Sequence, residues 1–367
     1  MKQGWEIVSI GSICNIKTGK LDANASSEEG AYPFFTCSKE ELRIDNYAYD
    51  CECVLIAGNG DLNVKYYNGK FNAYQRTYII SLKDGINKVL VKYIYKFFEK
   101  YIERLRQVSV GGVIKYIKLG DLTTAQLPVP PIAEQEKIVA ELDCISGIIE
   151  KKKQQLKELD NLAQSIFYEM FGDPVENDKG WDVKKFGDVA NSELGKMLDS
   201  KKNQGELYPY LCSANVQWND VDCTQVKEMR FEEDELERYR VYKGDLLICE
   251  GGDTGRCAIW KSDNAIYYQN ALHRVRFVGG LMLPIFCLYT MKCYKERGEI
   301  DKYSSGQTIK HLVKKVLLTI PLIVPPITLQ QDFASKIEAI EKQKELIAQS
   351  IKETEMLFNS RMDYYFN

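Results

Sequence analysis

Two glycine-rich loops with polar neighbours are the features of this sequence best suited to chemistry. "VLIAGNGD" (Val54–Asp61) and "LLICEGGD" (Leu246–Asp253) both read as a buried strand that runs into such a loop. Glycine lets a backbone approach phosphate closely, and a nearby lysine can pair with its charge. Arginine can read guanine, and asparagine or glutamine can read adenine, in the major groove of DNA. The sequence therefore predicts a polyanion site, with base-reading side chains, on each of two globular segments.

The candidate contact residues are basic or amide side chains in or near these loops and in two Gly-x-x-Ile-Lys turns. In the first globular segment they are Lys20, Asn59, Lys65, Gln75, Arg76 and Lys115. In the second they are Lys196, Arg256, Gln269, Asn270, Arg274, Gln307 and Lys310. We predict that "NAYQR" (Asn72–Arg76) corresponds to "NALHR" (Asn270–Arg274), which would place Arg76 opposite Arg274.

Catalytic and metal-binding patterns are weak by comparison. The eleven cysteines are scattered without a C-x-x-C pair, and only His273 and His311 could join them as zinc ligands. We expect the cysteines to be small apolar side chains in a reducing compartment. The sequence has no phosphate-binding G-x-x-x-x-G-K-[ST] loop and no Asn/Asp-Pro-Pro-aromatic motif of adenine methyltransferases. We therefore predict no catalytic residue, no metal site and no cofactor in this chain.

Composition is ordinary for a globular protein, which we expect to lie in the cytoplasm. Hydrophobic residues make up 45% of the 367 residues and charged residues 28%. We expect neither a membrane-spanning helix nor a secretory signal, since apolar runs of the required length are lacking. Residues 1–127 contain 17 Lys+Arg against 14 Asp+Glu, whereas residues 128–173 contain 5 against 9. Any polyanion site is therefore expected to be a local patch on a globular segment.

The sequence is duplicated. "WEIVSIGSI" after Gly4 matches "WDVKKFGDV" after Gly180, and Gly19-Lys20 matches Gly195-Lys196. The tripeptide Pro-Pro-Ile, followed closely by glutamine, occurs twice at the expected start of a helix. The first proline is Pro130 in one copy and Pro325 in the other, 195 residues further on. The two prolines fix φ before the first turn of a helix. Several matches in the same order indicate two copies of a globule-plus-helix unit.

Each Pro-Pro-Ile begins a long predicted helix. Apolar residues recur along it in a stripe, at alternating spacings of four and three residues, which predicts coiled-coil pairing. The first stripe comprises Ile138, Leu142, Ile145, Ile149, Lys152, Leu156, Leu159, Ala163, Ile166 and Met170. The second comprises Phe333, Ile337, Ile340, Lys344, Ile347, Ile351, Thr354, Phe358, Arg361 and Tyr365. Helices of about 40 residues would be ~60 Å long. If the two helices pair antiparallel, the segment between them does not have to run back along the length of a helix. Antiparallel pairing also predicts an internal pseudo-two-fold axis, which suits a two-fold target such as duplex DNA.

The chain resembles the DNA-specificity (S) subunits of type I restriction-modification systems over essentially its whole length. The resemblance rests on "LPVPPIAEQEKIVAELD" with its copy "IPLIVPPITLQQDFASKIE", on the Trp-x5-Gly starts, and on "SSGQTIKHL" (Ser304–Leu312). It implies an α+β chain of two α/β target recognition domains, residues 1–127 and 174–319. These alternate with two conserved helical regions, residues 128–173 and 320–367, which act as antiparallel spacer helices.

The resemblance also implies a function without catalysis. Each recognition domain would read one half of a bipartite site on double-stranded DNA, and the helices would set the spacer. Two methylation subunits carrying S-adenosylmethionine, and restriction subunits using ATP and Mg²⁺, would complete the assembly. The candidate docking residues on the helices are Gln135, Glu136, Glu141, Gln330 and Gln331.

Two other readings remain open from the sequence. A scaffold could use the helices to join two protein-binding domains, and salt dependence would separate it from a DNA reader, since phosphate contacts weaken steeply with salt. A reader from a related system, with methylase and nuclease on another chain, would be identified by its neighbouring genes.

Overall fold

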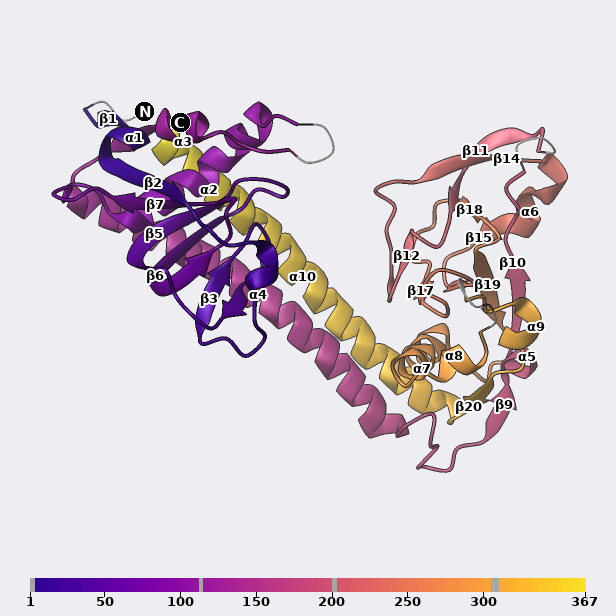
Figure 1. Cartoon of the computed structure of the whole chain (residues 1–367). Helices are drawn as coiled ribbons and strands as arrows, with labels where there is room; N and C mark the ends of the chain where they lie inside the picture. Colours follow the sequence, from indigo (N-terminus) through magenta and orange to yellow (C-terminus); the bar gives the residue numbers. More distant parts are fainter. Residues whose placement is uncertain (1–3, 112–114, 200–202, 305, 307–309) are drawn as a thin grey trace. The chain divides into compact units, whose positions relative to one another are not determined.

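The computed structural model describes residues 4–111, 115–199, 203–304, 306 and 310–367 (Figure 1). The chain falls into two compact units, one of Met1–Gln155 with Ile347–Asn367 and one of Leu156–Leu346. Each unit therefore contains one globular segment and one end of both long helices. Gln307, one of the candidate contact residues, lies outside the described residues.

The first unit is built on a six-stranded sheet in the order β2-β7-β5-β6-β3-β4. Its strands are β2 (Cys14–Thr18), β3 (Tyr32–Phe35), β4 (Leu42–Ile44), β5 (Tyr49–Ala57), β6 (Val64–Ala73) and β7 (Thr77–Leu82). A separate pair joins β1 (Glu6–Ser9) to β8 (Gln126–Val129). The helices of this globule are α1 (Ile10–Ile13), α2 (Val91–Val108) and α3 (Leu119–Thr123). Of these, α2 buries a stripe of apolar side chains against the sheet, as an amphipathic helix must.

The second unit repeats this plan with its sheet divided in two, in the orders β10-β19-β16-β17 and β14-β11-β18-β15. The first sheet contains β10 (Ala190–Leu194), β16 (Leu246–Cys249), β17 (Cys257–Ile259) and β19 (Leu272–Phe277). The second contains β11 (Glu206–Leu211), β14 (Lys227–Phe231), β15 (Arg240–Val241) and β18 (Ile266–Tyr268). Two short pairs join β12 (Val216–Gln217) to β13 (Asp220–Val221) and β9 (Val183–Lys185) to β20 (Pro321–Ile323). The helices are α5 (Phe186–Val189), α6 (Leu236–Tyr239), α7 (Pro284–Glu296), α8 (Glu299–Lys302) and α9 (Lys314–Leu317).

Strand β6 explains why one sheet is continuous and the other is divided. In the first unit β6 pairs with β5 along most of its length and with β3 at its end, through Asn72 and Ala73. In the second unit two strands share these roles, because β17 pairs with β16 and β18 pairs with β11. A loop between β17 and β18 therefore interrupts what is one strand in the first repeat.

Two 40-residue helices, α4 (Ile132–Phe171) and α10 (Ile327–Phe366), begin directly after the proline pairs. They are antiparallel within each unit. In the first unit Glu141 pairs with Arg361 and Lys152 with Ser350, and in the second Asp160 pairs with Lys344. The predicted apolar stripes are buried or half-buried along both helices. The prediction of two α/β domains and two long antiparallel helices is confirmed, while the two-fold relation between the units stays a prediction.

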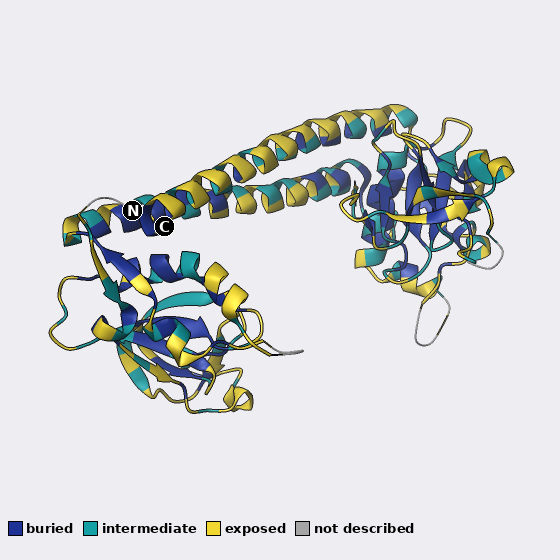
Figure 2. Cartoon of the chain, turned by 90° about the horizontal axis from the view of Figure 1, so that it is seen from above, coloured by how far each residue is buried: buried dark blue, intermediate teal, exposed yellow. Residues whose placement is uncertain are grey.

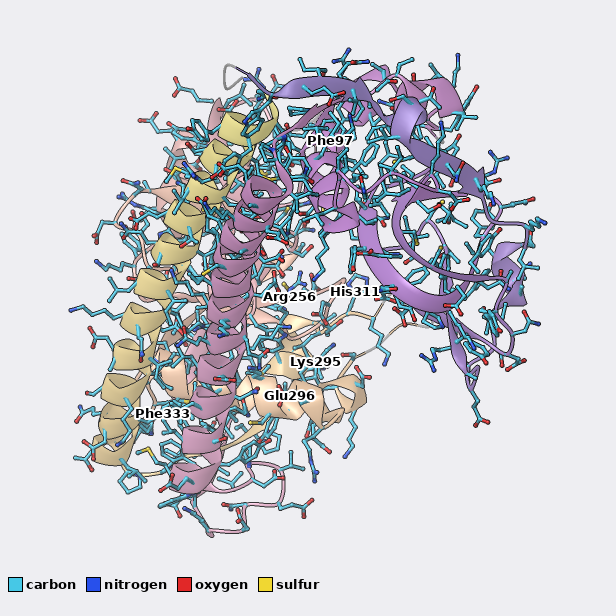
Figure 3. The ribbon with its side chains drawn as sticks, turned by 90° about the vertical axis from the view of Figure 1, so that its left-hand side faces the viewer. Phe97, Arg256, Lys295, Glu296, His311 and Phe333 are labelled. Atoms are coloured by element: carbon cyan, nitrogen blue, oxygen red, sulfur yellow. The ribbon has the colours of Figure 1, made fainter. Side chains whose placement is uncertain are left out.

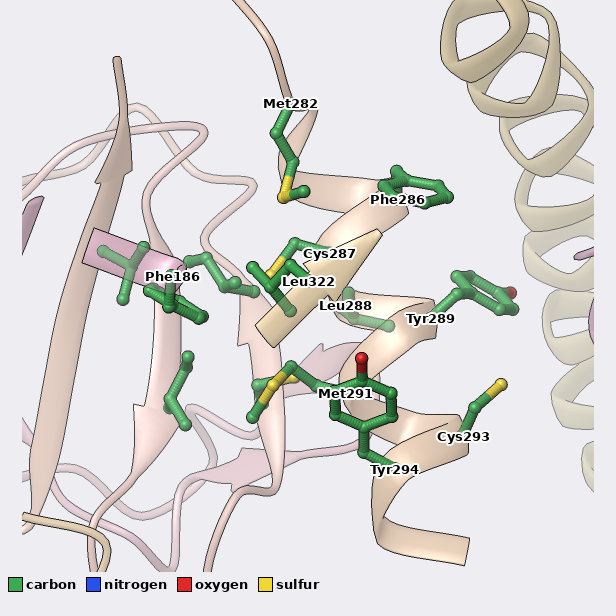
Figure 4. Close-up of a cluster of buried hydrophobic side chains, with 14 of the residues drawn as sticks. Phe186, Met282, Phe286, Cys287, Leu288, Tyr289, Met291, Cys293, Tyr294 and Leu322 are labelled. Atoms are coloured by element: carbon green, nitrogen blue, oxygen red, sulfur yellow. The ribbon is translucent and has the colours of Figure 1, made fainter. Parts of the chain in front are cut away.

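Each end of the helix pair belongs to the hydrophobic core of its unit. Ile138 and Leu142 of α4 join Met362, Tyr365 and Phe366 of α10 in the first core. In the second core Phe167, Phe171 and Phe333 pack against α7, whose Phe286 and Tyr289 lie on the side opposite Cys287 and Met291 (Figure 4). Figure 2 shows the buried residues gathered in the sheets and on one stripe of each long helix. Trp5 and Trp181 are half-buried against these cores.

Candidate nucleic-acid interface

Four chain segments of the first unit meet beyond the ends of β2, β5, β6 and β7. The Gly58 N–H donates to the Arg76 carbonyl at 2.8 Å, and the Ile117 N–H donates to the Gly58 carbonyl at 3.0 Å. The Gly19 N–H donates to the Thr77 carbonyl at 3.1 Å, and the Gln75 N–H reaches Leu21 at 2.9 Å. We call residues 19–21, 58–60, 74–77 and 115–118 loop cluster 1.

The second unit contains the same arrangement. The Glu250 N–H donates to the Ala271 carbonyl at 2.9 Å, and the Leu312 N–H donates to the Glu250 carbonyl at 2.7 Å. The Gly195 N–H donates to the Leu272 carbonyl at 3.1 Å, and the Asn270 N–H to Lys196 at 3.0 Å. We call residues 195–197, 250–256, 269–272 and 310–312 loop cluster 2.

These matching hydrogen bonds correct the predicted alignment of "NAYQR" with "NALHR". The Thr77 carbonyl accepts from Gly19, and the Leu272 carbonyl accepts the equivalent hydrogen bond from Gly195. Arg76 therefore corresponds to Ala271 and not to Arg274. Arg274 instead lies in β19, where it pairs with Leu247 of β16. Its counterpart in the first repeat is Ile79, which pairs with Leu55 in the same way. The match from the sequence was wrong by three residues. "NAYQR" covers the end of β6 and the turn that follows it, whereas "NALHR" covers the equivalent turn and the start of β19.

The corrected register exposes an equivalence that the sequence does not show. Tyr78 of the first repeat and His273 of the second occupy equivalent positions. Each side chain forms a hydrogen bond with a backbone carbonyl of the equivalent loop in its own repeat. The Tyr78 hydroxyl donates to the Ile117 carbonyl at 3.3 Å, and His273 Nε2 lies 2.7 Å from the Leu312 carbonyl. His273 is fully buried, and burial lowers its pKa. Of the two neutral tautomers, the one with Nε2–H can donate this bond.

Loop cluster 1 presents most of its candidate residues to solvent. Lys20, Gln75, Arg76 and Lys115 are exposed, and Asn59 is half-buried. Gln75 and Arg76 line a groove of about 390 Å³ together with Tyr116 and Lys118. The sequence reasoning missed Tyr116 and Lys118, although both follow directly on the Gly-x-x-Ile-Lys turn that it singled out.

Lys65 lies outside the four segments of loop cluster 1, as the second residue of β6. Its Nζ donates to the Ser38 carbonyl and lies 5.8 Å from the centre of the Phe35 ring. Burial lowers the pKa of Lys65. The ammonium group of Lys65 is thus bonded within the domain, and its role in DNA contact stays a prediction.

Gly19, Gly58 and Gly195 are required by backbone packing. A Cβ on Gly19 would lie 2.1 Å from the Ala73 carbonyl oxygen, and one on Gly195 would lie 2.3 Å from the Gln269 oxygen. A Cβ on Gly58 would lie 2.3 Å from the Arg76 oxygen. These positions exclude any larger residue, whether or not a phosphate approaches the loop.

Loop cluster 2 uses its predicted cations differently. Lys196 is 5% exposed, its Nζ pairs with Glu235, and it lies over the Phe231 ring. Arg274 is 7% exposed and donates to the carbonyls of Arg238 and Arg240. Both cations are thus held inside the domain, although Arg274 Nε is buried without a hydrogen-bond partner among the described residues. Their role in DNA contact stays a prediction.

Arg256, at the end of the second segment of loop cluster 2, belongs to a charged network with Asp253 and Lys295. Figure 3 labels Arg256 and Lys295. Arg256 donates to the Ser213 carbonyl at 2.9 Å and lies 3.6 Å from Asp253, which also pairs with Lys295 at 3.0 Å. Gln269 and Asn270 are half-buried, and Lys310 is exposed beside Asp301. Burial raises the pKa of Glu250 at the centre of the cluster. Loop cluster 2 thus carries more acidic groups than loop cluster 1.

Three of the candidate docking residues on the helices are engaged within the chain. Gln135 and Gln330 are fully buried, and each amide joins the start of its long helix to the segment before α2 or α7. Glu141 accepts from Arg361 at 2.9 Å and from the Tyr365 hydroxyl at 2.6 Å. These three groups are thus bonded inside their units, and their role in docking stays a prediction. Glu136 and Gln331 are exposed and remain candidates.

All eleven cysteines are free. Within the described ranges, no group of three or more His, Cys, Asp or Glu side chains is placed to hold a metal ion. The helices among those residues include none that is long and apolar enough to cross a membrane.

The fold and the two loop clusters define a duplicated α/β binding protein whose repeats alternate with long helices. The chain belongs to the family described as type I restriction modification DNA specificity domain, whose model matches residues 2–161 and 178–356. The family predicted from the sequence is thereby confirmed.

Individual relatives agree with this family. The EcoDI type I restriction enzyme specificity subunit of Escherichia coli is 38% identical over 162 residues, which are 44% of this chain and 35% of that protein. The match thus spans about a third of that relative's length. A putative type I restriction enzyme specificity subunit of Haemophilus influenzae, S.HindORF215P, is 22% identical over 92% of this chain and 87% of its own length. The crystal structure of the S subunit of a type I restriction-modification system from M. genitalium superposes with a TM-score of 0.60, at 16% identity, covering 100% of this chain and 98% of that one.

Proposed function

We propose that this chain is the sequence-reading subunit of a type I restriction-modification enzyme, with each repeat reading one half of a bipartite site on double-stranded DNA. The observation that carries this proposal is the pair of equivalent loop clusters in a chain of the DNA specificity family. Their shared hydrogen bonds hold four loops together beyond the strand ends. Rigidly held loops suit a site in which a few side chains must meet base edges accurately.

Loop cluster 1 supports the most specific assignment of roles. Arg76 and Gln75 lie side by side on an exposed turn, and these are the residue types that pair with guanine and adenine. Lys20, Lys115 and Lys118 are exposed around them and suit phosphate contacts, which position a protein without reading sequence. Loop cluster 2 would use Asn270, Gln269 and Lys310, with Arg256 held by its neighbours.

The wider assembly is part of the same proposal. Methylation subunits with S-adenosylmethionine would dock on exposed faces of the long helices, where Glu136 and Gln331 lie. Restriction subunits with ATP and Mg²⁺ would join them. Two methylation subunits would match the two copies of the helical region. No cofactor is assigned to this chain.

The test begins with the target sequence. Methylome sequencing of cells that carry the chain and its methylation partner identifies the modified motif, and duplexes containing it then serve as ligands for the purified complex. We expect Arg76→Ala to weaken binding roughly 5- to 150-fold, by the ~1–3 kcal/mol of a bidentate base contact, and to relax specificity in one half-site only. Lys137→Ala, an exposed charge removal on α4, is the matched control and should leave specificity unchanged.

Two results would contradict the proposal. Relaxed specificity in both half-sites would show that the repeats do not read independently. If the complex showed no preference for duplex DNA even at low salt, the scaffold reading would replace the DNA reading.

A further inference from the structure

The buried glutamines align α2 with α7 residue by residue. Gln135 accepts from the Leu90 N–H at 2.9 Å, and Gln330 accepts from the Leu283 N–H at 2.9 Å. Leu90 and Leu283 are therefore equivalent, which makes Tyr101 of α2 the counterpart of Tyr294 in α7. Arg104 is likewise the counterpart of Arg297, just beyond the end of α7. The same register pairs Tyr93 with Phe286, and these contact the equivalent residues Phe366 and Phe171 at 5.3 and 4.7 Å.

In the second unit an acidic turn covers this part of α7. The turn follows α4 and has the sequence Asp173-Pro174-Val175-Glu176. Arg297 lies 3.6 Å from the Asp173 carboxylate and 3.5 Å from that of Glu176. The Tyr294 hydroxyl lies 3.3 Å from the Pro174 carbonyl, and Val175 packs against the hydrophobic core.

The first unit has an open groove of about 610 Å³ at the equivalent place. Its walls include Tyr101 and Arg104 of α2, with Phe366 at the end of α10 and Gln126, the counterpart of Pro321. Arg104 is exposed, and its guanidinium stacks 5.7 Å over the Tyr101 ring. In the part of the chain that the structure describes, Arg104 has no carboxylate partner, whereas Arg297 has two.

We propose that this groove binds an acidic turn of a partner protein, of the Asp-Pro-x-Glu type that the second repeat provides for itself. Arg104 would pair with the two carboxylates, as Arg297 does in the second unit. Tyr101 would meet the backbone of the turn, and Phe97, Phe366 and Val108 would receive its apolar residue. This site does not depend on DNA recognition, because it is lined by α2, the end of α10 and Gln126 of β8 and includes no residue of loop cluster 1.

Charge favours an acidic occupant over a basic or neutral one. Lys100, on the same wall, already pairs with Glu103 at 2.8 Å and with Asp363 at 2.9 Å. Arg104 is therefore the cation of the groove left available for a ligand. Guanidinium groups bind carboxylates through directed hydrogen bonds, which gives such a site selectivity for Asp and Glu.

The test uses a labelled peptide with the sequence of residues 172–177, "GDPVEN", blocked at both ends and titrated against the full-length chain by fluorescence anisotropy. We expect saturable binding within about 1 mM peptide, the weak range for a small contact. Arg104→Glu should weaken this binding about tenfold or more, because it places like charges together. A peptide with lysine at both acidic positions should not bind. Lys92→Glu makes the same change of charge on an exposed position of α2 outside the groove, and it should bind like the unmodified chain.

Three outcomes would overturn the proposal. The first is the absence of saturable binding with a correctly folded chain, as judged by circular dichroism. The second is equal affinity of the unmodified chain and the Arg104→Glu variant, which would place the peptide elsewhere. The third is displacement of the bound peptide by duplex DNA in the unmodified chain and in the Lys92→Glu variant alike, which would assign the groove to nucleic acid.

Discussion

At the scale of single residues, the two repeats hold the same loop with different chemistry. Tyr78 and His273 both contact the carbonyl of the equivalent residues Ile117 and Leu312. A tyrosine hydroxyl keeps its proton throughout the physiological range, whereas a histidine changes charge near neutral pH. The second repeat is therefore sensitive to acid at a position where the first repeat is not.

The pH dependence of stability tests this difference. Burial lowers the pKa of His273 in the folded chain, so below about pH 6.5 the unfolded chain binds one more proton. The free energy of unfolding should then fall with falling pH, by up to about 1.4 kcal/mol per pH unit while only the unfolded form is protonated. His273→Tyr, which copies the first repeat, and His273→Gln should both remove this component.

Urea unfolding at several pH values between about 7.5 and 5.5 measures this contribution of His273 to the free energy of unfolding, since the interval brackets the ordinary histidine pKa. The other histidine, His311, is exposed, and His311→Gln is the matched control, expected to keep the pH dependence of the unmodified chain. An unchanged dependence in both His273 variants would show that the acid sensitivity arises elsewhere.

At the scale of elements, a buried glutamine fastens each long helix to its domain. Gln135 Nε2 donates to the carbonyls of Lys88 and Pro130, both at 2.8 Å, and its Oε1 accepts from Leu90. Gln330 repeats this pattern with Leu281, Pro325 and Leu283. The proline pair sets where the helix begins, and the amide sets where the preceding segment meets it. Both are needed to fix the angle between helix and domain.

We expect Gln135→Ala to lower the free energy of unfolding by about 2–4 kcal/mol, because it leaves buried backbone groups without partners. Gln135→Glu should also be destabilising, since a carboxylate cannot donate to the two carbonyls. Urea denaturation followed by circular dichroism measures both changes. Gln331→Ala, one residue beyond the equivalent glutamine but exposed, should change stability by no more than about 0.5 kcal/mol. A loss as large in the Gln331 variant would argue against the amide contacts as the cause.

At the scale of the whole molecule, the proposed function makes the two long helices a spacer between two readers. Each helix runs for 40 residues and passes from one unit into the other. One heptad inserted into both helices would lengthen each by about 10 Å, which corresponds to about three base pairs of DNA. We expect the unspecific spacer of the modified motif to grow accordingly, as measured by methylome sequencing. Insertion into only one helix breaks the pairing register and should abolish methylation. An unchanged spacer after the double insertion would contradict the spacer role.

The sequence by itself determined the duplicated plan of this protein. Helix periodicity, the two Pro-Pro-Ile tripeptides and the repeated glycines depend on local spacing, and local spacing is read directly from the residues. Even the polar members of the stripes have partners, such as Ser350 and Thr354 for Lys152 and Asp160 for Lys344. The candidate residues on exposed turns, such as Gln75 and Arg76, could be predicted for the same reason.

Only the tertiary structure decided which polar side chains are used internally. Lys196, Arg274, Gln135 and Glu141 belong to residue types that usually face solvent or a ligand, yet each is bonded to groups of its own unit. The correspondence of Tyr78 with His273 was equally hidden, because it depends on backbone hydrogen bonds between segments far apart in the chain. A sequence specifies local periods, whereas burial and pairing depend on which distant segment folds against each residue.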